Sequence, residues 1–478
     1  MAAGETDAGD DALAARADLR LTAHPLQRCG SRAVVALAGR ASAAEVDAVV
    51  LDGVAEGLTR DMVRAAVTQK DGAAYDWWKV LFALYPNSPP THSSRSRDPA
   101  ALQPKIAGMF ADLRDGAGRP CTFCGQSAWA VWGKDKLPMF DSTKAVNTLT
   151  PQSTGWPVCQ ACRIAVWALP YGSWVTAGSA TVLSCGEDAV ERDFVTRNVA
   201  RARRIMQLGF SGLPANASAE TITLHALREH ADRAPAGATL WMFKNDNQEP
   251  WLRVTATRGG IPLFLHRMLA DPDSRRGWQA LSAVLTVRDK AGQVTASGAA
   301  RAARTLFDPA DRPGAAVADR LPRELLNRAG DLSRVTSKTL VAWRALCRLY
   351  LEVMYGMDIG QVKPVRELVT DWITQETNAR GRFNEYARVS GSAFKLQKLL
   401  MLASARLLLD GRQPPDITAA APALLAPDQD GWRLRGLLFF DVVADLAGRG
   451  VQIGQKTEDE DEVAPDDLGF PGDDEEGA

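Results

Sequence analysis

The spacing of apolar residues along the chain predicts helices in its first part. In residues 33–67 apolar side chains recur every three or four positions, and Ser or Thr stands near the start of each run, as in amphipathic helices. Residues 75–84 continue as an apolar helix that ends before Pro86, because proline cannot donate a helical hydrogen bond. A polar loop rich in Pro, Ser and Arg is expected to follow.

The pattern changes in the middle of the chain, where strands are predicted. Residues 165–185 and 238–257 are rich in Val, Thr, Trp and Phe and are interrupted by Gly, Asn and Pro, which is typical of antiparallel strands. Residues 188–209, between them, have the spacing of a basic helix. Beyond residue 332 only helical patterns remain, in four amphipathic stretches joined by short links: residues 337–356, 364–377, 383–411 and 431–450.

These patterns predict an α+β fold with four parts. Residues 17–330 are expected to form a domain of mixed helices and antiparallel strands, into which residues 121–162 are inserted. Residues 331–450 are expected to form a C-terminal helical bundle. Residues 1–16 and 451–478, where acids, Gly and Pro replace apolar residues, are predicted to be disordered.

Composition excludes several classes of protein. With 46% hydrophobic and 24% charged residues in 478, the chain is neither disordered throughout, nor collagen-like, nor a small disulfide-stapled domain. The first residues are acidic where a signal peptide would be cationic, and no stretch approaches the roughly eighteen apolar residues of a membrane span. The sequence therefore predicts a cytoplasmic protein with no membrane partner.

The net charge of −1 hides a strong asymmetry. Eleven acids and no base lie between Glu458 and Glu476, and removing them changes the net charge of the remainder to +10. Removing residues 1–16 as well gives +13. A cationic body with acidic ends suggests a polyanionic partner, although a solubilising tail on an ordinary surface is an equal alternative.

The strongest chemical signal is a pair of CxxC motifs. Cys121 and Cys124, followed by Gly125, are separated by a 34-residue spacer from Cys159 and Cys162. Each motif turns the chain so that both thiolates face one point, and two such turns can provide a tetrahedral shell for zinc. Because all four positions are thiolates, no place remains for a reactive water, so the predicted zinc is structural. Two unrelated turns or a redox pair are the alternatives.

No motif for catalysis accompanies these cysteines. The five histidines are scattered without the spacing of a metalloprotease helix, and neither GxxxxGK[ST] nor GxSxG occurs. The acids near the end lack the rigid scaffold that a two-metal nuclease needs. The sequence predicts that the protein is not an enzyme.

Three basic groups are candidates for nucleic-acid contact. The Pro-stiffened loop after Pro86 offers amide, hydroxyl and guanidinium donors, and the helix over residues 188–209 aligns arginines on one face. Residues 338–406 carry eleven bases against six acids. A helical bundle with such a basic flank could bind a single strand of nucleic acid. A solvated surface explains each group as well. The candidates are Asn87, Ser88, His92, Arg95, Arg97, Arg197, Arg201, Arg204, Arg382, Lys395 and Lys398.

The order of these motifs resembles the large subunit of type I CRISPR effector complexes (Cascade), particularly the subtype I-B form with a four-cysteine zinc site. The resemblance covers about residues 20–265, and its most specific part is the paired CxxC. The chain departs from the family at Arg28, where a small or acidic residue is usual. The matching segments are His24-Pro25, Cys29-Gly30, the LYPNSP loop from Leu84, CTFCG from Cys121, WPVCQAC from Trp156, LPYG from Leu169, and Phe243-x-Asn245.

The resemblance implies a non-catalytic subunit of an RNA-guided antiviral complex. Such a protein contacts the guide RNA assembly and the other Cascade subunits, recognises the short motif (PAM) that flanks the target in double-stranded DNA, aids strand opening, and recruits a separate helicase-nuclease. Its helical C-terminal part resembles the small subunit. Because guide pairing supplies sequence discrimination, no catalytic residues are required. The family's Phe-x-Asn segment adds Lys244 and Asn245 to the nucleic-acid candidates.

Two other hypotheses fit part of the sequence. A free-standing, zinc-containing DNA-binding regulator would bind a defined duplex site with a steep salt dependence. A cysteine or metal-dependent enzyme would need a free thiolate or an open ligand position, and four protected thiols would exclude it.

Overall fold

The computed structural model describes residues 18–115, 117–139, 155–214, 217–232, 236–245, 250–309, 319–329, 335–375 and 379–451. Its contacts divide the chain into two compact units. The first unit contains Met1–Pro214 and Leu240–Val254, and the second contains Ala215–Thr239 and Thr255–Ala478. The segments predicted to be disordered, 1–16 and 451–478, lie outside the described residues apart from Val451, and the expected boundary near residue 330 falls inside the second unit.

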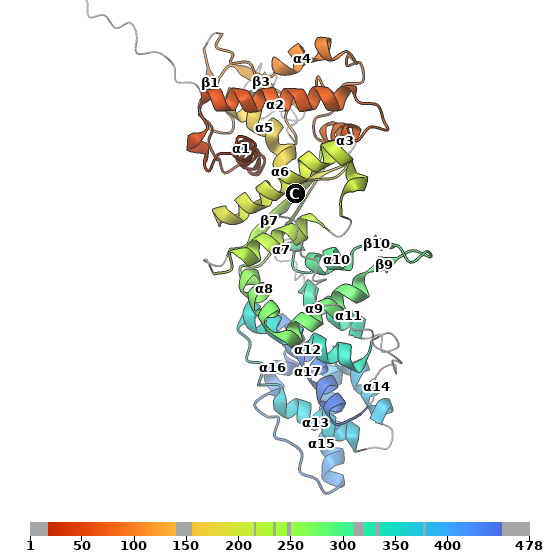
Figure 1. Cartoon of the computed structure of the whole chain (residues 1–478). Coiled ribbons are helices and arrows are strands. Elements are labelled where there is room, and N and C mark those ends of the chain that lie inside the picture. The colour runs from red at the N-terminus through yellow and green to blue at the C-terminus, as the bar shows by residue number, and fades with distance from the viewer. Residues whose placement is uncertain are drawn as a thin grey trace, which may run out of the picture. The chain divides into compact units, whose positions relative to one another are not determined.

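The first unit combines helices with short strands (Figure 1). Strands β5 to β8 lie side by side in one sheet in the order β8, β7, β6, β5. The elements are α1 (Pro25–Leu37), the 3-10 turn η1 (Ala43–Glu45), α2 (Ala48–Val67), α3 (Ala74–Leu84), α4 (Pro99–Ala107), β1 (Arg119–Pro120), β2 (Ser127–Ala128), β3 (Ala130–Trp132), β4 (Trp156–Val158), α5 (Gln160–Gly172), β5 (Trp174–Val175), β6 (Ala180–Cys185), α6 (Asp188–Leu208), η2 (Phe210–Gly212), β7 (Ala238–Lys244) and β8 (Trp251–Ala256).

The predicted apolar helix before Pro86, the basic helix α6 and the strands β7 and β8 are confirmed. The prediction of strands throughout residues 165–185 is wrong for its first half, because Ala165–Gly172 belongs to α5. Every residue of α5 is buried, so this helix has no polar face and its apolar run looks like a buried strand in the sequence. Strands β5 and β6 form only the second half of the segment, as an antiparallel pair.

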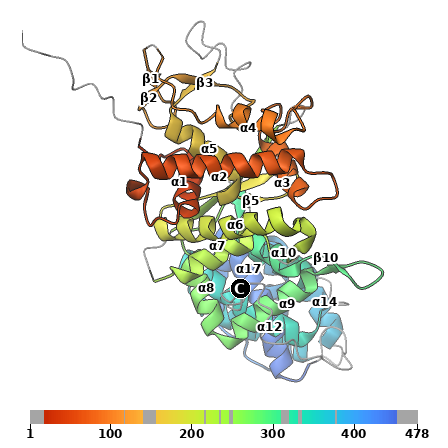
Figure 2. The ribbon, with the colours of Figure 1, turned by 45° about the horizontal axis from the view of Figure 1, so that its top comes forward.

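The packing of α1 on α5 organises the first unit. The backbones approach so closely that a Cβ on Gly30 would lie 1.9 Å from the carbonyl oxygen of Ala165. A Cβ on Gly172, the last residue of α5, would lie 3.0 Å from the Cβ of Ala33 and 3.2 Å from the sulfur of Cys29. Glycines at both contacts let α1 lie directly on α5, and α6 packs against both helices (Figure 2).

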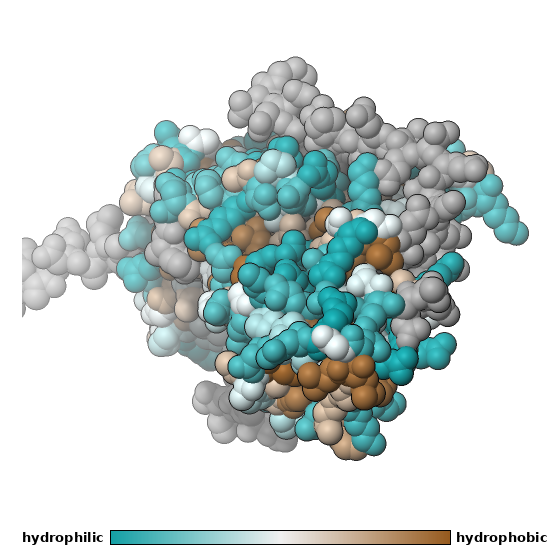
Figure 3. Space-filling view, turned by 90° about the horizontal axis from the view of Figure 1, so that it is seen from below, coloured by the Kyte–Doolittle hydropathy of each residue, from teal (hydrophilic) through white to brown (hydrophobic). Residues whose placement is uncertain are grey.

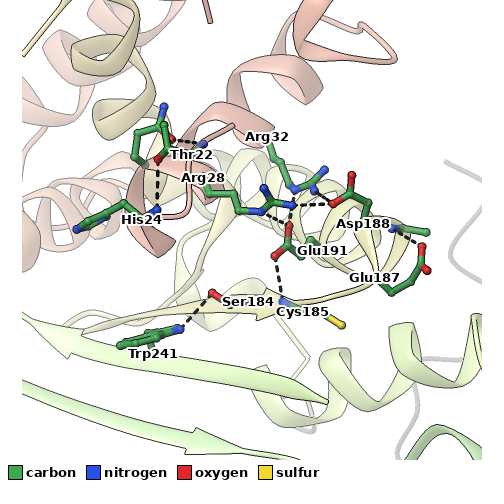
Figure 4. Close-up of polar contacts among 12 residues, drawn as sticks. Thr22, His24, Arg28, Arg32, Ser184, Cys185, Glu187, Asp188, Glu191 and Trp241 are labelled. Carbon is green, nitrogen blue, oxygen red and sulfur yellow. Dashed lines mark hydrogen bonds and ion pairs between the residues drawn. The ribbon is translucent and has the colours of Figure 1, made fainter. Parts of the chain in front are cut away.

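An ion network with a buried centre, Arg32 and Glu191, ties α1 to α6. Arg28 and Arg32, one turn apart, each donate Nε to Glu191 Oε2 at 2.7 Å and Nη2 to Asp188 Oδ1 at 2.6 Å (Figure 4). The other oxygen of Glu191 accepts the backbone N–H of Cys185 at 3.0 Å, at the end of β6. Arg28 therefore has a structural role in this chain, as a partner of two carboxylates of α6.

The described residues of the second unit are mainly helical, apart from a short hairpin at residues 287–296 and a two-residue strand, Asp308–Pro309 (Figure 1). Strand β11 pairs antiparallel with Thr255 and Ala256, the last residues of β8. Its elements are α7 (Ala219–Glu229), α8 (Ile261–Ala270), α9 (Pro272–Leu285), β9 (Val287–Arg288), β10 (Val294–Ala296), α10 (Gly298–Arg304), β11 (Asp308–Pro309), α11 (Arg320–Ala329), α12 (Ser337–Tyr355), α13 (Lys363–Thr374), α14 (Ala379–Val389), α15 (Ala393–Leu409), α16 (Ala421–Leu425) and α17 (Gln429–Gly448).

The predicted C-terminal helices are confirmed, with one correction. Residues 383–411 form two helices, α14 and α15, because the chain breaks at residues 390–392 and Ser392 caps a new helix by accepting the backbone N–H of Lys395. The core of this region contains Trp343 of α12 and Trp372 of α13, both fully buried. The fold as a whole is α+β, as predicted, with a helical C-terminal region. None of the described helices combines the length and apolar character needed to cross a bilayer.

The contact at Gly30 generates the first prediction. Gly30→Ala places a methyl group against a backbone carbonyl that cannot move without displacing α5, so it should lower the free energy of unfolding by about 3 kcal/mol or more. Gly53→Ala is the matched control, because this α2 glycine has no atom within 4 Å of its Cβ direction and should gain about 0.5–1 kcal/mol. Denaturant unfolding of the two variants measures the difference; equal stabilities would contradict the packing described above.

Candidate metal centre and basic surfaces

The first cysteine pair lies on a tight turn between β1 and β2. The backbone N–H of Cys121 donates to Gln126 O at 2.7 Å, and that of Gly125 donates to Cys121 O at 2.9 Å. Gly125 has φ +76°, a left-handed conformation that a side chain would disfavour. The residue after the CxxC pair thus closes the turn and directs both sulfurs to one side.

The second pair lies at the start of α5. Cys159 is the residue before the helix, and Cys162 is in its first turn. Strand β4 leads into this turn and pairs with β3, so the two ends of the long spacer lie together. Both the backbone N–H and the hydroxyl of Thr122 donate to Pro157 O, at 2.9 and 3.1 Å, which joins the two cysteine turns directly.

The four sulfurs form one compact cluster. The Sγ atoms of Cys121, Cys124, Cys159 and Cys162 all lie within 4.8 Å of one another, and those of Cys124 and Cys159 are 3.6 Å apart. A tetrahedral zinc site with Zn–S bonds of about 2.3 Å has sulfurs roughly 3.8 Å apart. The donor set and its size therefore fit a four-coordinate, thiophilic metal ion, and no other group of this kind occurs among the described residues.

The pKa values of the four cysteine thiols depend on hydrogen bonds among them, and a bound cation would change these values. The pKa of Cys121 is lowered because its sulfur accepts hydrogen bonds from Cys124 and then from the other two thiols. The pKa values of Cys159 and Cys162 are raised, chiefly because their thiols are held in hydrogen bonds to Cys121. The pKa of Cys124 is lowered like that of Cys121, so the four thiols are not equivalent. A divalent ion bound by all four sulfurs would favour the thiolate form of each and would release the remaining protons.

Helix α1 supplies a second layer around the cluster. The side chain of Gln27, fully buried, donates Nε2 to the sulfur of Cys162 at 3.5 Å and to Ser31 Oγ at 2.9 Å. Its Oε1 accepts the hydroxyl of Thr22 at 2.7 Å. The ring of His24 packs edge-on against that of Phe123, between the first two cysteines, at 5.0 Å. Gln27 was not among the predicted site residues, since no local motif marks it.

The first turn of α5 is clamped on its other side by Gln160 and Arg163. Gln160 Nε2 donates to Phe110 O at 2.9 Å, and the Arg163 guanidinium donates to the carbonyls of Met109 and Ala111. Burial lowers the pKa of Arg163 to about 10. The turn that carries two sulfurs is thus held by polar contacts to the chain after α4, independently of any metal.

Comparison of the chain with protein-family models, curated proteins and solved structures finds no match in any of the three.

The predicted loop after Pro86 divides into an internal and an external part. Asn87 adopts a left-handed conformation (φ 67°), and the buried Ser88 bonds to the hydroxyl of Thr91 at 2.8 Å. His92 is exposed, and its Nδ1 lies 2.7 Å from Ser94 Oγ. Ser88 is therefore part of the loop's own hydrogen bonding inside the protein, whereas His92 lies at the surface and bonds to Ser94.

Two predicted arginines of this loop converge on the end of α2. Arg95 Nε and Arg97 Nη1 both donate to the carbonyl of Ala66, at 3.2 and 3.0 Å. The pKa of Arg95 is lowered, first by burial and then by the charge of Arg97. The pair satisfies a helix-end carbonyl and leaves the exposed Arg97 at the surface.

An aromatic row beside these arginines was missed by sequence reasoning. Tyr75, Trp78 and Phe82, on successive turns of α3, stack with ring centroids 5.1 and 5.3 Å apart. The guanidinium of Arg95 lies 4.5 Å from the centroid of Trp78, and Lys79 lies 5.4 Å from that of Tyr75. Phe82 is 44% exposed at the end of the row. The spacing of three and four residues was present in the sequence, but it equally describes a buried face.

Asn245 of the Phe-x-Asn segment holds the LYPNSP loop in place. It is buried, its backbone N–H donates to Ala83 O at 3.0 Å, and its Nδ2 donates to Leu84 O at 2.8 Å. Its neighbour Lys244 is half-buried at the end of β7. The contacts of Asn245 are thus directed inward.

The three predicted arginines of α6 have different surroundings. Arg201 stacks on Trp174, with its guanidinium carbon 3.7 Å from the ring centroid, and donates to Val175 O at 2.8 Å. Burial lowers its pKa to about 10. Arg197 is exposed, and Arg204 is half-buried. Arg201 therefore anchors β5 to α6, and Arg197 is the solvent-facing member of the group.

The predicted basic residues of the second unit are spread over two helices. Arg382 of α14 lies over the ring of Trp372, 4.6 Å from its centroid. Lys395 and Lys398 are exposed on α15, and Lys398 lies 4.4 Å from the ring of Phe394. An open depression of about 550 Å³ between α8, α9 and α12 contains further arginines, but carboxylates pair with them, Arg344 with Asp441 for example.

Metal binding generates the second prediction. The purified chain should hold one metal ion, and Cys121→Ser should lose it together with cooperative unfolding of the first unit, because three sulfurs leave the shell open. Cys185→Ser is the control, since Cys185 is half-buried outside the cluster. Elemental analysis and thiol alkylation measure the outcome. A folded wild-type chain without metal, with all four thiols reactive, would contradict the assignment.

Proposed function

We propose that this protein is the non-catalytic large subunit of a type I, I-B-like, RNA-guided CRISPR complex. In this role it contains a structural zinc, recognises the motif that flanks the target in duplex DNA, aids strand opening and recruits a helicase-nuclease.

The observation that carries the proposal is the convergence of the resembling segments. Their residues are far apart in the sequence, yet they pack on one another around α5. His24 contacts Phe123, and Gly172 of the LPYG segment lies close to Cys29. Tyr85 stacks on Trp167 with centroids 4.1 Å apart, and Asn245 bonds to Leu84. Segments that resemble one family by motif thus lie together around α5, and this convergence supports the proposal.

Zinc is the proposed metal because of the donor set. Four thiolates are soft ligands that favour zinc over magnesium or calcium, and a closed set of four leaves no position for water. The ion would be held by Cys121, Cys124, Cys159 and Cys162, with Gln27 bonded to one sulfur. Its role is then to fix the start of α5 against the turn between β1 and β2, and not to activate a substrate.

The proposed nucleic-acid surface of the first unit is the aromatic row of α3 with its flanking cations. Aromatic rings provide stacking faces for bases, and cations beside them contact the phosphates of the backbone. Arg97 and His92 are exposed on the adjoining loop. This combination suits unpaired bases, such as those released when a duplex opens, because stacking requires no particular sequence.

Association with RNA is the third prediction. A tagged full-length chain purified from its native cells should bring down an RNA of uniform length and repeated backbone-forming subunits. Gly53→Ala, a surface change on α2, should retain them. A chain that purifies alone and binds one defined duplex site with a steep salt dependence would instead be a free-standing zinc-containing regulator.

The α3 surface generates the fourth prediction. Phe82→Ala should weaken binding of single-stranded DNA by roughly 5- to 150-fold if one base stacks on this ring. Arg97→Ala should reduce the slope of log affinity against log salt by about 0.7 for one lost phosphate contact on a single strand. Leu208→Ala, at another exposed apolar residue of the first unit, is the control for Phe82. Unchanged affinity in both α3-surface variants would remove this surface from the proposal.

A further inference from the structure

Helix α15 presents a long apolar stripe to solvent. Phe394, Met401 and Leu408 are seven residues apart, and Leu402 and Leu409 extend the same stripe. Their side chains are between 51% and 81% exposed. The opposite face of α15, with Leu399 and Leu407 among others, is buried against the rest of the unit. Figure 3 shows this end of the molecule, where apolar side chains gather among hydrophilic ones. We refer to the five exposed residues as the α15 stripe.

The charged side chains within α15 are all positive, and one of them, Arg406, pairs with Asp410 at 3.8 Å. Lys395, Lys398 and Arg406 lie on the exposed side of the helix, and α15 contains no acid; the first carboxylate is Asp410, just beyond its end. Two copies of this face packed together would bring cations against cations. The surface therefore suits a segment that is both apolar and acidic.

The structure brings the end of the described chain close to α15. Asp371 of α13 accepts Arg449 Nη1 at 2.6 Å, just after α17, and Arg412 Nη2 at 3.4 Å, just after α15. The Asp371 carboxylate thus pairs with the arginine that follows α15 and with the arginine that follows α17, so the C-terminal ends of these two helices lie close together. The chain beyond Val451 therefore starts near the end of α15 at which Leu408 and Leu409 are exposed.

The sequence beyond that point has the matching composition. Residues 457–478 contain eleven acids and no base, together with Val463, Leu468 and Phe470. The 27 residues from 452 onward can reach up to roughly 90 Å when extended, whereas the 17 residues of α15 span about 26 Å. Covalent attachment gives the segment an effective concentration on the order of millimolar at the stripe.

We propose that residues 457–478, the acidic tail, dock on the α15 stripe of the same chain. Val463, Leu468 and Phe470 contact the apolar side chains, and the carboxylates pair with Lys395 and Lys398. The docked tail covers cations that would otherwise attract any polyanion. This inference uses neither the metal nor the proposed RNA-guided role, so it can fail or hold independently of them.

Peptide binding tests the surface and the segment together. A fluorescent peptide of residues 457–478 should bind the chain truncated after Lys456, and Met401→Glu with Leu402→Glu in that chain should weaken binding about tenfold or more, since apolar contact is lost and repulsion added. Val49→Glu, which changes an exposed apolar residue of α2, should leave the affinity for the peptide unchanged. A peptide carrying Leu468→Ser and Phe470→Ser should bind more weakly than the natural one at equal charge.

Zero-length cross-linking tests docking within the full-length chain. A carbodiimide should join Lys395 or Lys398 to acids of 458–476 in the monomer, and the same two α15 substitutions should reduce these links several-fold. The proposal is overturned if the peptide binds equally well to the α15 variants, or if the truncated chain shows no affinity for it. It is also overturned if the stripe instead mediates dimers or binding to anionic vesicles in the full-length chain.

Discussion

The contact on which the first unit depends is the direct approach of α1 to α5 at Gly30. Because Gly30 lies on the carbonyl of Ala165, the start of α1 is brought to the first turn of α5, where Gln27 bonds to the sulfur of Cys162. The ion network of Arg28 and Arg32 then fixes α1 to α6. The cysteine cluster is therefore one end of a continuous helical contact, and its proposed role is to hold the start of α5 in register.

Much of the fold could be predicted from periodicity, and the exceptions have physical causes. Helices with one polar face, such as α6 and α12, were recognised because their burial is one-sided. Helix α5 was mistaken for strand because it is buried on all sides, which removes the periodic signal. The break between α14 and α15 depends on a serine cap within an otherwise helical pattern, a local choice that periodicity does not resolve.

The candidate site was predictable where chemistry is local, and not where it depends on tertiary structure. The spacing of the cysteines was enough to predict the four-sulfur cluster, because each CxxC turn is a local structure that places its two sulfurs on one side. The second layer could not be found, since Gln27 is near Cys162 only after folding. Charge was a poorer guide: Arg201 was selected for its charge, yet it stacks on Trp174 and bonds to a backbone carbonyl. Arginine serves internal packing as readily as phosphate binding.

The antiparallel pairing of β3 with β4 has a consequence for how this protein can vary. It holds both ends of the segment between Trp132 and Trp156, while Thr122 joins the two cysteine turns beneath it. Lengthening a loop whose ends are already fixed costs only about 0.6 kcal/mol for each doubling. An insertion whose two ends lie on these paired strands would therefore leave the register of β3 and β4 unchanged, and would leave the helices beyond them in place.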